Sequence, residues 1–308
     1  ERLAADGFVV SPRLAGMIAG PFPQGQTDDA KAYFTKPDGQ RYQAGCLLCE
    51  DGWSDNYELE PLALLQQNYD IDFFINSSAS PYTLGKNGKR NRVFGQQASA
   101  AGVPLFYVNA IGLQNNGKTI YTFDGSSTAY DAEGRIAAMA PEYSESLTII
   151  DTDSLNSPPV ADIPDEPEIA HIYRALHYGI RRFLENIHMQ KIVIGISGGI
   201  DSAVAAALYA SVVGPENLLL VNMPSVFNSE TTKGLSQKLA ENLGCQYMII
   251  PIQQSVDYTI EQLEHTPMIC LADGTTSQLN VSSFVTENIQ ARDRSARVLA
   301  GAAAAFGG

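Results

Sequence analysis

The stretch from Lys191 to Val213 constrains the fold of this chain more than any other. Residues 191–196 form a short β-branched run, typical of a strand buried on both faces, and residues 203–213 form an alanine-rich helical run. Between them lie the small residues Ser197, Gly198 and Gly199. A buried strand that leads through a small-residue loop into a helix is a unit of an α/β fold with a parallel sheet.

This loop predicts an anion site. Glycine lets backbone N–H groups approach a ligand closely, and the start of a helix leaves several N–H groups unpaired. Ser197 and Ser202 add hydroxyl donors, whereas Asp201 suits a phosphate site only if a cation screens it. We therefore expect Mg²⁺ there, with Asp201 as a ligand. The alternative is an ordinary strand-to-helix turn with a serine cap.

The run Ser-Gly-Gly-Ile-Asp-Ser at residues 197–202 resembles the pyrophosphatase loop of the ATP pyrophosphatases, which adenylylate a substrate and release pyrophosphate. It is not a Walker A loop, because no Gly-Lys-Ser/Thr follows. The resemblance implies ATP as a substrate.

Composition narrows the possible partners. A chain of 308 residues suits two domains, and 44% apolar residues suffice for packed cores. The net charge of −14 disfavours nucleic acid as a partner. No apolar stretch approaches the roughly 20 residues of a membrane helix, so we expect no membrane association and a cytoplasmic location. The four cysteines are too scattered for a disulfide framework.

The N-terminal half predicts a sheet sandwich with helices outside. Residues 1–35 carry no clear pattern, and residues 77–91 read as a polar loop. Strands are expected at 42–48, 72–76, 104–110, 118–123, 128–130, 136–138 and 147–150, and helices at 61–69 and 92–101.

A proline-rich, acidic segment at residues 153–169 is typical of a linker between two domains, 1–152 and 170–308. In the second domain, an amphipathic helix at 171–189 precedes the loop. Strands at 218–222 and 246–251 alternate with a helix at 230–243. This alternation predicts a doubly wound parallel sheet, whose ligands lie outside the carboxyl ends of the strands.

Cys49 is the candidate nucleophile of the first domain, because it stands at a strand end directly before two acidic residues. Residues 1–150 contain no histidine, so a Cys-His pair cannot form there. A lysine and a glutamate could activate the thiol instead. The alternative is a small buried cysteine without a catalytic role.

Two sets of motifs occur in one chain. Residues 48–53, 78–86 and 107–126 are similar to the nitrilase-type glutaminase domain of the glutamine-dependent NAD synthetase family. Residues 197–202, 223–225 and 287–292 resemble the synthetase domain of the same family. The resemblance implies an α/β fold class: a nitrilase-like α-β-β-α sandwich followed by a doubly wound sheet of the ATP-pyrophosphatase type, both incomplete.

The resemblance also implies roles for single residues. Cys49 would form a thioester with glutamine, which Glu50, Ser80 and Lys86 would hold. Asn288 and Arg292 would contact deamido-NAD, and Asp201 would bind Mg²⁺. ATP would be bound by the loop residues Gly195, Ile196, Ser197, Gly198, Gly199, Ile200, Asp201 and Ser202.

The family's catalytic glutamate and lysine are expected upstream of Cys49, where Glu1, Lys31 and Lys36 are the only such residues and none matches the motif. A second metal carboxylate is expected beyond Gly308. We therefore expect the chain to be a fragment, and the family implies a homo-oligomer. Two other functions are possible: a different amidotransferase such as GMP synthetase, whose glutaminase uses a histidine, or a catalytically silent nucleotide-binding scaffold.

Overall fold

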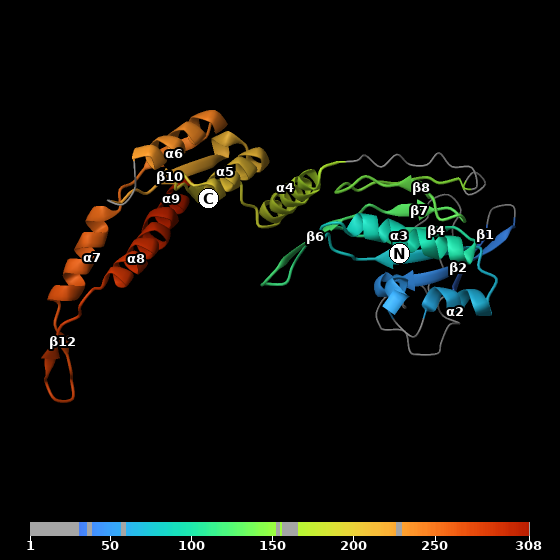
Figure 1. Cartoon of the computed structure of the whole chain (residues 1–308), viewed down its shortest axis with the longest axis horizontal. Helices are drawn as coiled ribbons and strands as arrows, with labels where there is room; N and C mark the ends of the chain where they lie inside the picture. Colours follow the sequence, from blue (N-terminus) through green and yellow to red (C-terminus); the bar gives the residue numbers. More distant parts are fainter. Residues whose placement is uncertain are drawn as a thin grey trace. The chain divides into compact units, whose positions relative to one another are not determined.

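The computed structural model describes residues 31–35, 39–56, 60–151, 155, 166–225 and 230–307. The chain divides into two compact units, Glu1–Gly179 and Ile180–Gly308 (Figure 1). This division falls within helix α4 (Glu168–Asn186). Residues 1–30 and most of the predicted linker lie outside the described residues, so the domain boundaries at 152 and 170 stay predictions.

The first unit is built on a mixed six-stranded sheet with the strand order β1-β2-β3-β4-β7-β8. Strands β2, β3 and β4 run parallel, and β1, β7 and β8 extend the sheet antiparallel to their neighbours. A separate hairpin of β5 and β6 follows β4. The strands are β1 (Lys31–Thr35), β2 (Arg41–Leu48), β3 (Phe73–Ser78), β4 (Leu105–Asn109), β5 (Ile111–Asn115), β6 (Ile120–Asp124), β7 (Thr128–Tyr130) and β8 (Ile136–Met139).

Two helices connect the parallel strands. Helix α2 (Pro61–Asn68) joins β2 to β3, and α3 (Lys86–Ala101) joins β3 to β4. Their apolar residues form one core with alternate residues of the strands, because neighbouring side chains on a strand point to opposite faces. This core contains Leu47, Leu62, Leu65, Phe74, Phe94, Ala98, Leu105, Tyr107 and Tyr130.

The second unit contains a parallel three-stranded sheet, ordered β11-β10-β9. Its strands are β9 (Ile192–Gly195), β10 (Leu218–Asn222) and β11 (Gln246–Ile249). All five residues of β10 are buried, since Leu218 and Leu220 face a core with α5 (Ile200–Val213) and α6 (Glu230–Leu243), and Leu219 and Val221 face the opposite core. Both faces of the sheet are therefore covered, as in doubly wound folds.

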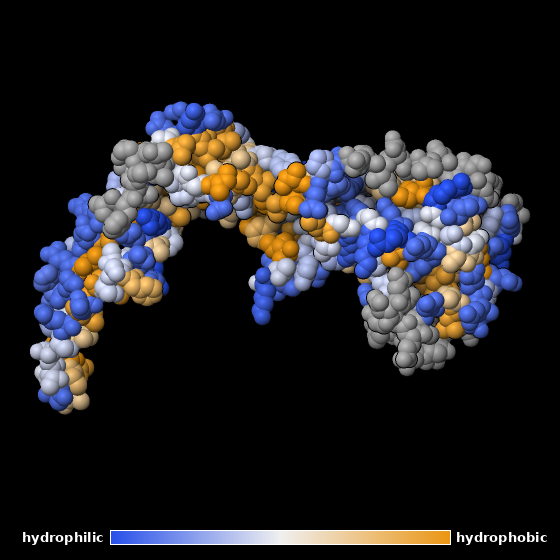
Figure 2. Space-filling view, in the orientation of Figure 1, coloured by the Kyte–Doolittle hydropathy of each residue, from blue (hydrophilic) through white to orange (hydrophobic). Residues whose placement is uncertain are grey.

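The opposite core is closed by α7 (Gln253–His265) and by one continuous helical segment at the end of the chain. That segment consists of α8 (Ser283–Arg292), the π-helix η4 (Asp293–Leu299) and α9 (Ala300–Phe306). A hairpin of β12 (Met268–Ile269) and β13 (Thr276–Ser277) lies between α7 and α8 (Figure 1). Figure 2 shows hydrophobic side chains at the surface around α5 and α6, where Ile200 and Leu235 are exposed.

Four expectations from sequence need correction. Helix α3 begins at Lys86, so the predicted polar loop at 77–91 is shorter. Residues 147–150 form no strand. Strand β9 is half-buried rather than buried on both faces, because it is the edge of the described sheet. Helix α5 begins at Ile200 rather than at residue 203, which places Asp201 and Ser202 in its first turn.

Candidate active sites

Cys49 lies where β2 ends and a 3₁₀ turn, η2 (Cys49–Asn56), begins. Its φ of 41° is in the left-handed region, which non-glycine residues rarely adopt. A sharp strand-to-helix turn of this kind exposes a nucleophile at the edge of a sheet. Since strain of this kind persists only when neighbours impose it, the contacts around Cys49 identify what fixes the turn.

Those contacts come from both sides of the turn. The Leu48 N–H donates to Asp51 Oδ2 at 2.9 Å, and the fully buried Asn76 donates from Nδ2 to the Cys49 carbonyl at 3.5 Å. Gly52 lies against Asn76 and Phe94 so closely that a Cβ at residue 52 would overlap both. The backbone of Cys49 is thus held by its own turn and by β3.

Lys86 is the cation of this site. It is the first residue of α3, half-buried, and its Nζ donates to the Pro81 carbonyl at 3.1 Å. Burial lowers the pKa of Lys86, as does the positive charge of Arg90, while negative charge on Asp124, Cys49 and Glu50 raises it. The ammonium group therefore shares one electrostatic environment with the thiol and with Glu50.

Ser80 is held by Asn109 from the next strand. Asn109 Oδ1 accepts from the Ser80 N–H at 2.9 Å, and Asn109 Nδ2 donates to the Ser80 carbonyl at 3.2 Å. Both residues are buried. Because Cys49 follows β2, Ser80 follows β3 and Asn109 ends β4, the site lies along the carboxyl edge of the three parallel strands.

A buried polar network supports this edge. Arg90 and Asp124 form an ion pair at 3.2 Å, and each side chain is only 1% exposed. Arg90 also donates to Asn87 Oδ1, and Asn87 Nδ2 donates to Glu142 at 3.2 Å. The sequence patterns did not identify Arg90 or Asn87, since both lie in the stretch that was expected to be a polar loop.

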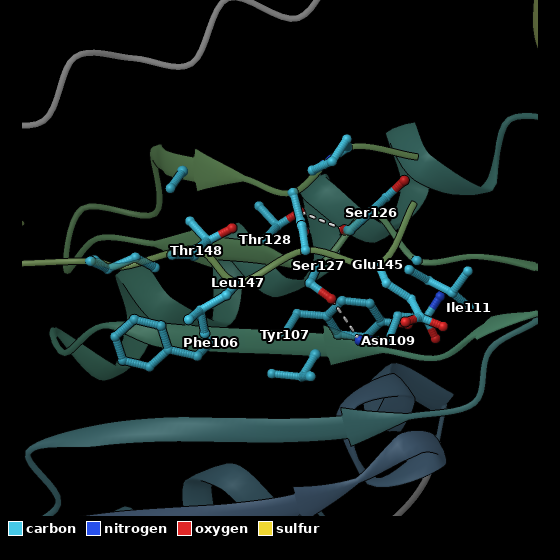
Figure 3. A pocket seen from close by; sticks show the side chains of 18 residues that line it. Phe106, Tyr107, Asn109, Ile111, Ser126, Ser127, Thr128, Glu145, Leu147 and Thr148 are labelled. Atoms are coloured by element: carbon cyan, nitrogen blue, oxygen red, sulfur yellow. Dashed lines mark hydrogen bonds between the residues drawn. The ribbon is translucent and has the colours of Figure 1, made fainter. Parts of the chain in front are cut away.

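A cavity of about 580 Å³ lies beside β4 (Figure 3). Its lining includes Phe106, Leu147, Thr128 and Ser127, whose Oγ accepts from the Asn109 N–H at 3.0 Å. Neither Cys49 nor Lys86 lines it. Asn109, which binds the Ser80 backbone, does line it, so this cavity adjoins the cysteine site without containing the nucleophile.

The second candidate site is the loop between β9 and α5. Its serines bond to each other and to the backbone: Ser202 Oγ lies 3.2 Å from Ser197 Oγ and donates to the Gly199 carbonyl at 3.0 Å. The Gly199 N–H donates to Ser197 Oγ at 3.2 Å, and Gly198 has a φ of 84°. These bonds fold the loop around the exposed first turn of α5, which offers N–H groups to an anion.

A cavity of about 460 Å³ opens beside this loop. It is lined by Gly195, Ile196 and Ser197 at the end of β9 and the start of the loop, Asn222 and Met223 at the end of β10, and Ala291, Arg294, Ser295 and Leu299 from the terminal helical segment. Gly195 is a close-approach position, because a Cβ there would lie 2.9 Å from Met223 Cε and 3.3 Å from a Leu299 methyl. Sequence patterns indicated the loop but not Arg294, which lines the same cavity.

The predicted contacts Asn288 and Arg292 lie together on α8. Arg292 Nη1 donates to Asn288 Oδ1 at 2.9 Å, and Arg292 is exposed. Neither residue lines the cavity beside the loop. Glu1 and Lys36 lie outside the described residues.

Asp201 is the predicted metal ligand, and it is exposed in the first turn of α5. Among the described residues, no group of three or more His, Cys, Asp or Glu side chains could hold a metal ion. Mg²⁺ is often bound by one or two carboxylates together with substrate phosphates. A single carboxylate beside unpaired helix N–H groups fits an ion of that kind. Within the described part of the chain, no helix is long and apolar enough to cross a membrane.

Both halves of the chain match known protein families. Residues 11–156 match the family model described as carbon-nitrogen hydrolase, and residues 172–305 match the model described as NAD synthase. The glutamine-dependent NAD(+) synthetase of Synechocystis sp. is 33% identical over 220 residues, which cover 68% of this chain and 38% of that protein. The Thermotoga maritima enzyme of the same name is 30% identical, covering 72% of this chain and 43% of that protein.

A solved structure is also similar. The glutamine-dependent NAD+ synthetase of Acinetobacter baumannii, described in complex with adenosine diphosphate, has a TM-score of 0.75 and 28% identity. The match covers 93% of this chain and 50% of that chain. The chain thus spans half or less of the length of these relatives.

Proposed function

Because this chain belongs to the glutamine-dependent NAD synthetase family, we propose that it catalyses the ATP-dependent amidation of deamido-NAD to NAD with nitrogen from glutamine. One observation carries the proposal. A strained cysteine turn near the half-buried Lys86 and a phosphate-type loop at a helix start occur in one chain, each at the carboxyl ends of parallel strands. An enzyme that only hydrolyses an amide would need the cysteine turn but not the phosphate-type loop.

In the first unit, Cys49 attacks the side-chain amide carbon of glutamine. The C–N bond breaks, ammonia leaves, and water hydrolyses the resulting thioester to glutamate. Glutamine is a zwitterion, which suits an anionic and a cationic partner. Glu50 and Lys86 supply these charges, and Ser80 supplies polar groups held in place by Asn109.

In the second unit, the loop Gly195–Ser202 binds the phosphates of ATP. The carboxylate of deamido-NAD attacks the α-phosphorus and pyrophosphate leaves; ammonia then replaces AMP on the acyl carbon. Asp201 holds Mg²⁺, which neutralises charge on the leaving pyrophosphate when it is bound. Asn288 and Arg292 bind deamido-NAD. The cytoplasmic location and the homo-oligomer expected from sequence stay predictions.

The test uses the full-length protein with ATP, Mg²⁺ and glutamine. Deamido-NAD should yield NAD and AMP in equal amounts. Turnover with xanthosine monophosphate and none with deamido-NAD would overturn the proposal in favour of a GMP-synthetase-like enzyme. Absence of any adenylylation would favour the silent scaffold.

A second experiment separates the two units. Cys49→Ala should abolish NAD synthesis from glutamine and leave synthesis from free ammonia intact, because ammonia bypasses the thioester. Cys245→Ala is the matched control, since Cys245 packs against the core of α5 and α6. Equal loss with both nitrogen sources would mean that Cys49 is structural.

A further inference from the structure

Arg294 lies in the π-helix η4, at a place where the helical pattern is interrupted. A π turn holds more residues than an α turn, so it changes the direction in which the following side chains point, and such turns are frequent at functional sites. Here the π turn faces the cavity beside the loop, and both Arg294 and Ser295 line that cavity.

Three arginines lie close together on the α8–η4 segment, and their surroundings differ. Arg297 is bound to Asp293 through two bonds of 2.7 Å and donates to Ser255 Oγ at 2.8 Å. Arg292 bonds to Asn288 on its own helix. Neither of these two lines the cavity, whereas Arg294 does.

A hydrogen bond to a backbone carbonyl fixes the position of the Arg294 side chain and leaves its positive charge without a neutralising carboxylate among the described residues. Its Nε donates to the Met223 carbonyl at 3.4 Å, and its side chain is half-buried. A guanidinium group has five N–H donors, so this bond leaves the outer nitrogens available for the cavity. Within the described part of the chain, Arg294 forms no ion pair with a carboxylate. Arg294 shares its cavity with Ile196 and Ser197 at the start of the phosphate-type loop, and a fixed cation there is suited to an anion.

We propose that Arg294 binds the phosphate chain of the nucleotide in the cavity that it shares with Ser197. The inference rests on the proposed function, because that function places ATP at the loop. Arg294 then supplies the positive charge that the loop itself lacks, since residues 195–202 contain an aspartate and no basic residue. This also explains how an acidic residue is tolerated beside phosphates when Mg²⁺ is not yet bound.

The experiment measures binding of adenosine, AMP and ATP to the chain by calorimetry, without turnover. Arg294→Gln should weaken ATP binding by about 10- to 100-fold, as expected for loss of a charge-assisted bidentate contact. The loss should be smaller for AMP and absent for adenosine. Arg294→Lys should give an intermediate loss, because lysine keeps the charge but not the planar fork.

Arg297→Gln is the matched control, because Arg297 lies on the same π turn but is bound to Asp293 and Ser255. It should bind ATP as the unsubstituted chain does. An equal affinity for ATP in Arg294→Gln, or an equal loss for adenosine and ATP, would overturn the inference while the proposed function stands. If the unsubstituted chain bound no ATP, the proposed function itself would fail.

Discussion

Asn109 binds both backbone groups of Ser80, with bonds of 2.9 Å and 3.2 Å that join the end of β4 to the loop after β3. A side-chain amide carries one acceptor and one donor group, so it can satisfy a peptide N–H and C=O together. The pair therefore fixes one wall of the cysteine site.

We predict that Asn109→Ala raises the KM for glutamine at least tenfold and leaves ammonia-driven synthesis unchanged. Two buried backbone groups would lose their partners, which should lower the free energy of unfolding by about 1–3 kcal/mol. Asn115→Ala is the control, because Asn115 only accepts from the Gly117 N–H in an exposed hairpin turn. Steady-state kinetics with both nitrogen sources and thermal unfolding check the prediction; an unchanged glutamine KM would contradict it.

Asp124→Ala should destabilise the first unit strongly. It would leave the guanidinium of Arg90, 1% exposed, without its buried partner, and removal of one member of such a pair costs about 3–5 kcal/mol. Arg182→Ala breaks an exposed pair with Glu185 at 2.9 Å and should cost no more than about 1 kcal/mol. Denaturant unfolding measures both. Equal losses of unfolding free energy in the two variants would show that the buried pair stabilises the protein no more than the exposed pair does.

Much of the architecture could be predicted from the alternation of apolar runs and turn residues. The strand at 218–222 and the helix at 230–243 have the predicted bounds because their patterns are local. Residues 86–91 were misjudged, since Lys-Asn-Gly-Lys-Arg-Asn has no apolar periodicity. This first part of α3 is stabilised instead by long-range partners, in particular Asp124 and Glu142.

The distinction between local sequence patterns and long-range partners also applies to the two candidate sites. Cys49 and the loop at 197–202 carry local motifs, and the sequence indicated both. Arg90, Asn109 and Arg294 matter through neighbours that lie 15 to 71 residues away in the chain. Their partners become apparent only when the strands are assembled side by side. In the terminal helical segment a motif marked residues 287–292, but Arg294 lies beyond it in the π turn, which breaks the 3.6-residue period.

Cys46 should be alkylated much more slowly than the exposed Cys270. Burial raises the pKa of the Cys46 thiol to about 11 from an ordinary value of 9.0. At pH 8 this lowers its thiolate fraction about 100-fold, and the thiolate is the reactive form. Iodoacetamide should label Cys46 at least that much more slowly than the exposed Cys270, with a rate that rises about tenfold per pH unit towards pH 11.

Mass spectrometry of the labelled peptides measures these rates. Glutamine should slow the labelling of Cys49 and not that of Cys270, because only Cys49 lies in the proposed glutamine site. Labelling of Cys46 at the rate of Cys270 would disprove the effect of burial.

The pairing of Asp293 with Arg297 should make stability depend on pH in the acid range. The hydrogen bond from Arg297 lowers the pKa of Asp293 below 3.8, burial opposes this, and Ser255 adds to the lowering. The unfolded state then binds more protons than the folded state in this range. The contribution of the Asp293–Arg297 pair to folding stability is complete above the pKa of Asp293 in the unfolded state, near 4. It is lost as the pH falls through the lowered pKa of Asp293 in the folded state. The melting temperatures of the unsubstituted chain and Arg297→Gln should therefore differ at pH 7 and converge towards pH 2; a constant difference would contradict this linkage.

Asp201→Asn separates the role of the carboxylate from that of the loop. The substitution keeps the size of the side chain and removes a negative charge from the exposed first turn of α5. In the presence of EDTA, ATP should bind the variant at least as tightly as the unsubstituted chain, because repulsion with the phosphates is removed. Mg²⁺ should then tighten ATP binding to the unsubstituted chain and have less effect on the variant.

Synthesis of NAD by the Asp201→Asn variant should fall by about 100-fold or more with glutamine and with ammonia alike, since charge on the leaving pyrophosphate loses its stabilisation. Asp257→Asn on the exposed face of α7, where Asp257 only accepts from Gln253 at 2.8 Å, is the control and should change neither quantity. Equal enhancement of ATP binding by Mg²⁺ in both chains would show that Asp201 is not a metal ligand, and the ion would then be held by the phosphates alone.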